Sequence, residues 1–195
     1  MEPRELLDFL SVLETLKTNA RHCMTKGGVP ETVAAHSWRL SVMAMLVAPE
    51  IGGLDRDKLI RMCLIHDFGE AITGDIPSFL KTASNERTED DAVALLLSKL
   101  PAPQRGELSE LFYEMQALET REARVYKALD KLEAVIQHNE SDIATWIPLE
   151  YDLNLDYGAE NAAEFPFLKA LRTLMREDTQ HKIQQAEEDN EDERI

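Results

Sequence analysis

The sequence has little cysteine and no long apolar run. Cys23 and Cys63 are its only cysteines, too few for a disulfide framework or a four-thiolate zinc site, and we expect both to be free thiols. The longest apolar stretches, such as LSVMAMLVA at 40–48, are shorter than a membrane span, and the amino terminus lacks a basic segment followed by an apolar run. We therefore expect a cytoplasmic protein with no membrane partner.

Positive charge is scarce as well. The chain has 21 lysines and arginines against 37 aspartates and glutamates, a formal net charge of −16. No broad basic surface is expected, which argues against long nucleic acid as a ligand. A small anionic substrate stays compatible with this charge, because a bound cation or one or two basic side chains suffice in a pocket. The acidic segment AEEDNEDERI, residues 186–195, is expected to be a flexible tail.

Apolar residues recur at intervals of three and four, which predicts helices, and long period-two alternation is absent. With 195 residues, of which 44% are hydrophobic, the chain can form one compact core. We predict an all-α bundle of about seven helices in a single domain over residues 1–185. Segment 142–162 is expected to be a packed loop. The expected helices cover residues 3–18, 30–48, 55–68, 86–100, 104–118, 121–141 and 163–184.

His36 lies within an apolar stripe of the helix expected at 30–48, so its side chain should point inward. A single inward histidine is more often a core residue than a metal ligand. In the next expected helix, His66 and Asp67 continue the apolar stripe that contains Cys63. An inward aspartate must be neutralised, paired or bound to metal, and no lysine or arginine lies nearby on that stripe. Two inward histidines and a carboxylate therefore favour a divalent-metal site.

Asp130 is ambiguous from its pattern alone. It projects almost opposite the bulky apolar stripe of its helix, as a solvated carboxylate would. Its own face is small or amphipathic, with Ala123, Tyr126, Ala134 and Gln137 recurring at three and four residues, as the wall of a pocket would. Both interpretations of Asp130 stay open at this point.

His36, the adjacent His66 and Asp67, and Asp130 together form a pattern that resembles the HD-domain metal-dependent phosphohydrolases. The similarity is carried by AAHSWRLSVMA around the first histidine, LIHDFGEAITGDIP around the pair and ALDKLEAVIQH around the last aspartate. It extends over about residues 5–140, and HD…GE…TGDIP resembles the branch that contains the bacterial 5′-deoxynucleotidases and their eukaryotic relatives. The resemblance implies a helical HD-domain fold, in agreement with the apolar periodicity.

The resemblance also implies roles for individual residues. Glu70 and Asp75 match acids beside the metal that position or activate water, although each is also compatible with a solvated residue or a turn. Arg21 matches a phosphate-binding arginine, and Lys81 stands where relatives often carry a lysine. One divalent ion, of manganese, cobalt, magnesium, zinc, iron or nickel, is implied as cofactor. Its implied ligands are His36, His66, Asp67 and Asp130.

His22 departs from the family pattern. Bacterial deoxynucleotidases that resemble this chain typically carry tryptophan directly after the arginine, near the sugar, whereas here histidine follows Arg21. His22 is either a surface residue or a substrate contact with a smaller, more polar face. The preference for deoxyribose over ribose is therefore open.

The leading hypothesis is a metal-dependent phosphohydrolase that removes phosphate from small nucleotides, as a 5′-nucleotidase acting on (deoxy)nucleoside 5′-monophosphates. A second hypothesis is another HD-type hydrolysis, of a nucleoside triphosphate, cyclic dinucleotide or alarmone. A third is a metal-containing module that binds nucleotides without cleaving them, and a purely structural role ranks last. By the same resemblance we expect a homodimer.

Overall fold

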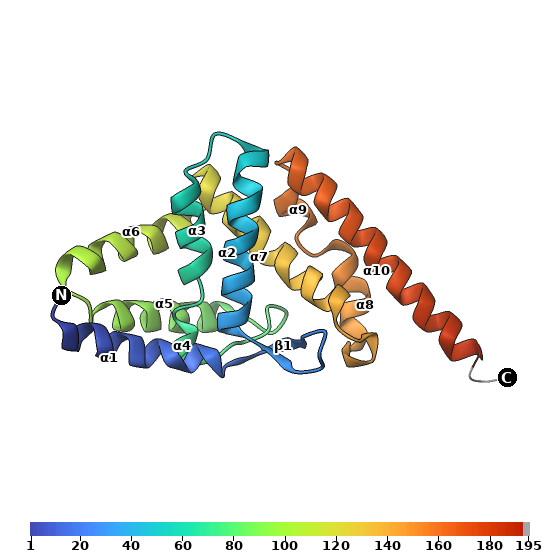
Figure 1. Ribbon diagram of the computed structural model, residues 1–195, viewed down its shortest axis with the longest axis horizontal. Helices are drawn as coiled ribbons and strands as arrows, with labels where there is room; N and C mark the ends of the chain where they lie inside the picture. The colour runs from blue at the N-terminus through green and yellow to red at the C-terminus, as the bar shows by residue number, and fades with distance from the viewer. Residues whose placement is uncertain (193–195) are drawn as a thin grey trace.

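The computed structural model describes residues 1–192, and its centre is helix α7 (Arg121–Glu140). Helices α2 (Val33–Ile51) and α3 (Arg56–Ile65) pack against each other and against α7 (Figure 1). The core between them is formed by side chains with no solvent exposure, among them Leu40, Leu59, Leu129 and Leu132. Burial of such side chains is the dominant favourable contribution to folding.

The remaining helices surround this centre. The seven expected helices are all present, so the predicted all-α fold is confirmed, and a few short helices are added. Besides α2, α3 and α7, the expected helices are α1 (Pro3–Leu13), α5 (Ala83–Leu97), α6 (Ala102–Ala117) and α10 (Pro166–Asp192). The added segments are α4 (Glu70–Thr73), α8 (Pro148–Asp156), α9 (Ala159–Ala162) and two 3₁₀ turns, η1 (Glu14–Lys17) and η2 (Ile143–Thr145). Within residues 1–192, no helix combines the length and apolar character needed to cross a membrane.

A short hairpin precedes α2. Strands β1 (Ala20–Met24) and β2 (Pro30–Thr32) pair antiparallel, so the helix expected from residue 30 begins three residues later. Thr32 ends the hairpin and caps α2, because its side-chain oxygen accepts a hydrogen bond from the backbone N–H of Ala35 at 3.2 Å. Strands of this length show no recognisable alternation in the sequence, which is why the hairpin was not expected.

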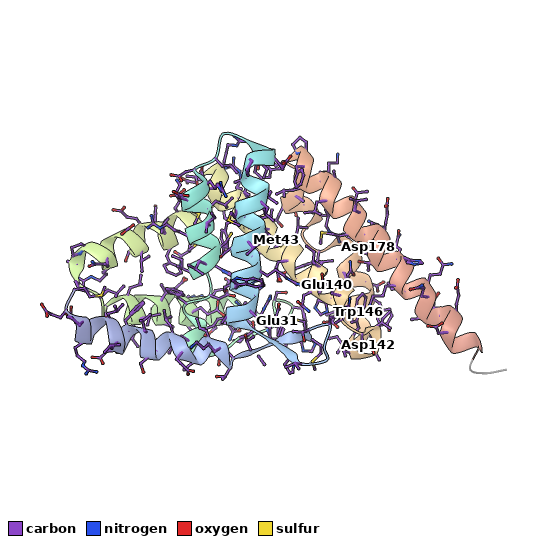
Figure 2. All side chains as sticks on the ribbon, in the orientation of Figure 1. Glu31, Met43, Glu140, Asp142, Trp146 and Asp178 are labelled. Carbon is purple, nitrogen blue, oxygen red and sulfur yellow. The ribbon has the colours of Figure 1, made fainter. Side chains whose placement is uncertain are left out.

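The C-terminal third is more helical than expected. Segment 142–162, expected as a packed loop, instead forms η2, α8 and α9 around the buried Trp146, which lies beside α8 (Figure 2). Helix α10 continues to Asp192, so residues 186–192 of the expected tail are helical and residues 193–195 lie outside the described part. Glutamine, alanine and glutamate are good helix formers, which explains why the helix does not end at residue 184.

Gly158 lets α9 pack closely against α7. Its φ of +78° lies in the left-handed region, and a Cβ there would be 2.9 Å from the Cβ of Lys131 on α7. Both the backbone conformation and the close approach therefore require glycine. This contact holds the α8–α9 segment beside α7.

We expect Gly158→Ala to lower the free energy of unfolding by about 2 kcal/mol or more, because it adds left-handed strain to a steric clash. Gly106→Ala is the matched control: Gly106 lies inside α6, and a Cβ there would meet nothing within 4 Å. The control should gain about 0.5–1 kcal/mol from helix propensity. Urea unfolding of both variants measures the difference, and equal effects of the two substitutions would contradict the assigned packing.

Candidate active site

Four polar side chains from three regions of the chain converge at the centre of the bundle. His36 lies on α2, His66 and Asp67 follow α3, and Asp130 lies on α7. His36 Nε2 is 3.3 Å from His66 Nε2 and 3.3 Å from Asp130 Oδ1. His66 Nε2 is 3.0 Å from Asp67 Oδ2 and 3.6 Å from Asp130 Oδ1. Asp130 therefore belongs to the site rather than to the solvated surface.

Hydrogen bonds behind the two imidazoles orient both rings. His36 Nδ1 donates to the carboxylate of Glu133, and His66 Nδ1 donates to the backbone carbonyl of Cys63 at 3.0 Å. With Nδ1 protonated, each ring presents the lone pair of Nε2 to the centre of the cluster. The two nitrogens and the neighbouring carboxylate oxygens are thus all electron-pair donors facing one another.

This donor set fits a divalent metal ion. Atoms that ligate one ion at about 2.0–2.2 Å lie about 2.8–3.6 Å from one another, and the separations of 3.0, 3.3 and 3.6 Å fall in that interval. Without a metal ion, or a proton shared between an imidazole and a carboxylate, the converging lone pairs and carboxylates repel. Mixed imidazole and carboxylate ligands suit transition metals and zinc better than calcium.

The carboxylate of Glu133 is fully buried and connects the cluster to two arginines. Its Oε1 accepts a hydrogen bond from Arg39 Nε at 2.6 Å, and its Oε2 lies 3.4 Å from Arg21 Nη1. Burial alone would raise the pKa of Glu133, but His36 and the arginines lower it to about 2. Glu133 was not predicted from the sequence as part of the site, although it lies three positions after Asp130 on the same helix.

A cavity of about 240 Å³ opens beside the cluster. The sequence-predicted site residues that line it come from β1, the segment between α3 and α4, α4, the segment after α4, and α7. These are Arg21, His22, His66, Asp67, Glu70, Asp75, Lys81 and Asp130. His36, the fourth member of the cluster, does not line the cavity, because its side chain is fully buried. The fold thus brings all nine predicted positions to one place.

Glu70 and Asp75 both line the cavity. Glu70 is buried, and its Oε2 has no hydrogen-bond partner within residues 1–192. Burial and the nearby Asp67 and Asp75 carboxylates raise the pKa of Glu70 to about 9. Burial also raises the pKa of Asp75, although Arg21 opposes this. Neither acid is an ordinary solvated residue.

The basic residues of the cavity are held by acidic neighbours. Arg21 Nη1 is 2.9 Å from Glu31, which lies at the base of α2 (Figure 2). The same nitrogen makes the contact of Arg21 with Glu133. Lys81 Nζ is 2.9 Å from Glu89 Oε1 and 3.7 Å from Glu70 Oε1.

Lys127 is a second residue that the sequence analysis missed. Its Nζ is 2.9 Å from Asp130 Oδ2, and it lines the cavity. Burial would raise the pKa of Asp130, but Lys127 and the two imidazoles hold that pKa well below its usual range. Its position three residues before Asp130 in one helix was the available signal.

The wall far from the cluster is built by His22, His138 and Glu150. His22 is part of this wall, its ring centroid 5.5 Å from that of Phe79. His22 Nε2 and His138 Nε2 lie 3.5 and 3.4 Å from Glu150 Oε1. Neither His138 nor Glu150 was predicted from the sequence to be part of the site. The segment that contains Glu150 was expected to be a loop.

Comparison with known proteins places the chain among its relatives. The HD domain family model matches residues 13–172. Human 5′-deoxynucleotidase HDDC2 is 35% identical over 141 residues, which cover 70% of this chain and 68% of the human protein. The 5′-deoxynucleotidase hdd1 of Schizosaccharomyces pombe is 29% identical over 140 residues, which cover 68% and 70% of the two chains.

A solved structure is similar over nearly the whole chain. The crystal structure of a predicted metal-dependent phosphohydrolase from Magnetospirillum magnetotacticum MS-1 aligns with a TM-score of 0.77 and 29% identity, covering 92% of this chain and 93% of that one. Because the chain matches the family model, its relatives and a solved structure of this kind, it belongs to the HD-domain family of metal-dependent phosphohydrolases.

Proposed function

We propose that the chain is a metal-dependent 5′-nucleotidase that removes phosphate from deoxynucleoside 5′-monophosphates. One observation carries this proposal: two imidazole nitrogens and two carboxylates converge beside a cavity that Arg21, Glu70 and Asp75 also line. Relatives that are 5′-deoxynucleotidases, at up to 36% identity, support the nucleoside monophosphate as the substrate class.

The proposed ligands of the metal are the four clustered residues. A bound divalent ion would supply positive charge for the phosphoryl oxygens and would lower the pKa of a coordinated water. The imidazole rings of both histidines are already oriented toward the ion, since hydrogen bonds to Glu133 and to the Cys63 carbonyl fix them. Two nitrogen ligands favour a transition metal or zinc over magnesium. The residues are His36, His66, Asp67 and Asp130.

Arg21 is the proposed phosphate-binding residue. Glu31 and Glu133 both contact Nη1, which leaves the other edge of the guanidinium fork without an acid partner among the described residues. Burial would lower the pKa of Arg21, but these carboxylates raise it above its ordinary value, so the side chain stays charged. A fixed, charged, planar fork suits bidentate contact with a phosphate.

Lys81 and His22 are proposed as further substrate contacts. Lys81 adds positive charge at the end of the cavity near Glu70, while Glu89 holds its Nζ. His22 follows Arg21 directly on β1, so a phosphate on Arg21 places the adjoining sugar or base toward His22.

Glu70 and Asp75 are the proposed proton acceptors for the attacking water. Burial raises the pKa of Asp75, so its carboxylate is a stronger base than an exposed one, which suits general base catalysis. Glu70, whose pKa is raised to about 9, would be ionised at neutral pH only with a cation bound beside it. Asp75 is the more exposed of the two and is influenced by Arg21, so we assign it the water that attacks the phosphorus. Glu70 lies deeper, where its unpartnered Oε2 can accept a hydrogen bond from a second water.

We further propose a single functional domain over residues 1–185 that works in the cytoplasm as a homodimer. Both cysteines are free thiols, as expected in a reducing compartment. Trp38 and Leu46, two turns apart on α2, are 66% and 63% exposed, and an exposed apolar face of this kind supports pairing between copies.

The first test of the function is phosphate release from nucleotides. We expect the protein loaded with manganese or cobalt to release inorganic phosphate from deoxynucleoside 5′-monophosphates and to lose this activity in excess EDTA. Nucleoside triphosphates, cyclic dinucleotides and alarmones are tested in parallel. Turnover of one of these and none of the monophosphates, or nucleotide binding with no turnover at all, would refute the assignment.

Substitutions separate the proposed acid from the proposed ligands. Asp75→Asn should lower kcat by about 10²–10⁴-fold with bound metal unchanged, because it removes only the proton acceptor. Asp67→Asn should lower both kcat and the bound metal measured by mass spectrometry. Asp91→Asn, an exposed acid on α5, is the control and should change neither quantity. Full activity of Asp75→Asn would remove this residue from the mechanism.

Glu133 should control metal affinity without contacting the metal. Glu133→Gln weakens the hydrogen bond that orients His36, so we expect metal affinity to fall about 10–100-fold. Glu140→Gln is the matched control, because Glu140 also binds Arg39, at 2.7 Å, and is exposed. Competition with a chelator measures both affinities, and circular dichroism checks that both variants are folded. A similar loss in the two variants would assign the effect to Arg39 instead.

A further inference from the structure

The wall of the cavity on α8 contains two buried polar atoms that have no partner. Glu150 is 1% exposed and Asn154, one turn later, is 2% exposed. Glu150 Oε1 and Asn154 Nδ2 receive or donate no hydrogen bond within residues 1–192, yet both residues line the cavity. Buried polar atoms in folded proteins are nearly always hydrogen-bonded, so an acceptor and a donor left unpaired one turn apart on the same helix point to a ligand.

The rest of the Glu150 side chain is fixed. Its Oε2 accepts a hydrogen bond from the backbone N–H of Ile147 at 2.8 Å, at the first turn of α8. Only Oε1 is therefore available to a ligand. Helix α8 is in turn held by Arg172 of α10, which donates to the Asn154 carbonyl at 2.8 Å. The position of the free oxygen is set by the fold and not by a mobile side chain.

Two imidazoles flank the free oxygen without satisfying it. His22 and His138 lie 3.5 and 3.4 Å from Oε1, at the limit of a hydrogen bond. The ring of His138 rests edge-on against Trp146, with centroids 6.0 Å apart. Burial, with the charges of Arg21 and His22, lowers the pKa of His138 to about 4, so this ring is neutral at pH 7. His138 therefore supplies no positive charge to Glu150.

The location of this wall matches the nucleoside end of the substrate. Asp130, Ala134 and His138 lie on one face of α7 and all line the cavity. Eight residues of helix span about 12 Å, so His138 lies far along the cavity from the metal ligand Asp130. Arg21 and His22 are neighbours on β1 and connect the two ends. A phosphate at Arg21 therefore directs the remainder of a nucleotide toward α8.

We propose that Glu150 and Asn154 of α8, with His22 and His138, form a subsite that recognises the nucleoside through a hydrogen-bond donor beside an acceptor. Glu150 Oε1 accepts from an amino group of the base or a hydroxyl of the sugar, and Asn154 Nδ2 donates to the neighbouring acceptor. The inference rests on the proposed nucleotidase function, because that function places a nucleotide in the cavity. These residues are specificity determinants and take no part in phosphate transfer.

Glu150→Gln tests the subsite, because it replaces the free hydrogen-bond acceptor with a donor. The Ile147 N–H requires an acceptor, so the glutamine oxygen stays on this N–H and the amide nitrogen replaces Oε1. The substrates form two pairs: dCMP and dUMP differ in an amino or keto group, and CMP and dCMP differ in a sugar hydroxyl. We expect the ratio of kcat/KM within one pair to change at least 10-fold, and the pair that responds identifies the recognised group.

Controls separate recognition from folding and from the phosphate site. Asp152→Asn, exposed on the same helix, should leave both ratios unchanged. Inhibition by inorganic phosphate should be the same in the wild type and Glu150→Gln, because the subsite does not contact phosphate. If Glu150→Gln does not fold, Asn154→Asp removes the neighbouring donor and should shift the same ratio.

The outcomes distinguish this inference from the proposed function. Absence of turnover in the wild type would refute the nucleotidase, and the same ratios are then measured as dissociation constants of the nucleotides by calorimetry. Ratios that change less than twofold in folded Glu150→Gln and Asn154→Asp would overturn the subsite. An equal loss for all substrates together with weaker phosphate inhibition would also overturn it, because Glu150 would then act on the phosphate site.

Discussion

The arrangement of the site depends on the buried carboxylate of Glu133. A carboxylate removed from water must be compensated, and here Arg39 and the Nδ1 nitrogen of His36, both on α2, and Arg21 on β1 compensate it. The same contacts connect α7 to α2 and to β1. They also direct His36 Nε2 toward Asp130 and hold Arg21 at the cavity. One buried charge therefore fixes both a metal-type ligand and a phosphate-type ligand.

The cavity divides into two ends with different electrostatic character. At one end, lone pairs and carboxylates converge, and a cation relieves their repulsion. At the other end, Glu150 Oε1 and Asn154 Nδ2, one helical turn apart on α8, have no hydrogen-bond partner within residues 1–192, and the neighbouring His138 is neutral at pH 7. Such a division suits a substrate with an anionic end and a neutral, hydrogen-bonding end, as a nucleoside monophosphate has.

Much of the fold was predictable from the sequence because long helices have a strong apolar period. The period located α2, α3 and α7 and showed that His36, His66 and Asp67 point inward. It failed where a segment was short, as in the β1–β2 hairpin and α8, or where propensity outweighed charge, as at the end of α10. Lys127 and Glu133 lie three positions before and after Asp130, but neither was assigned to the site from the sequence, since charged residues near a helix face are usually solvated.

The sequence by itself determined which residue types face the interior of each helix, because helical phase fixes the direction of a side chain about its own axis. With the resemblance to the HD family, this predicted the metal-type ligands and the acids Glu70 and Asp75. Only the tertiary structure decided which helices face one another. Asp130, whose position was ambiguous in the sequence, lies in the cluster. His22 lies in the cavity wall, 3.5 Å from Glu150. Contacts between residues far apart in the chain follow from packing, and helical phase does not contain that information.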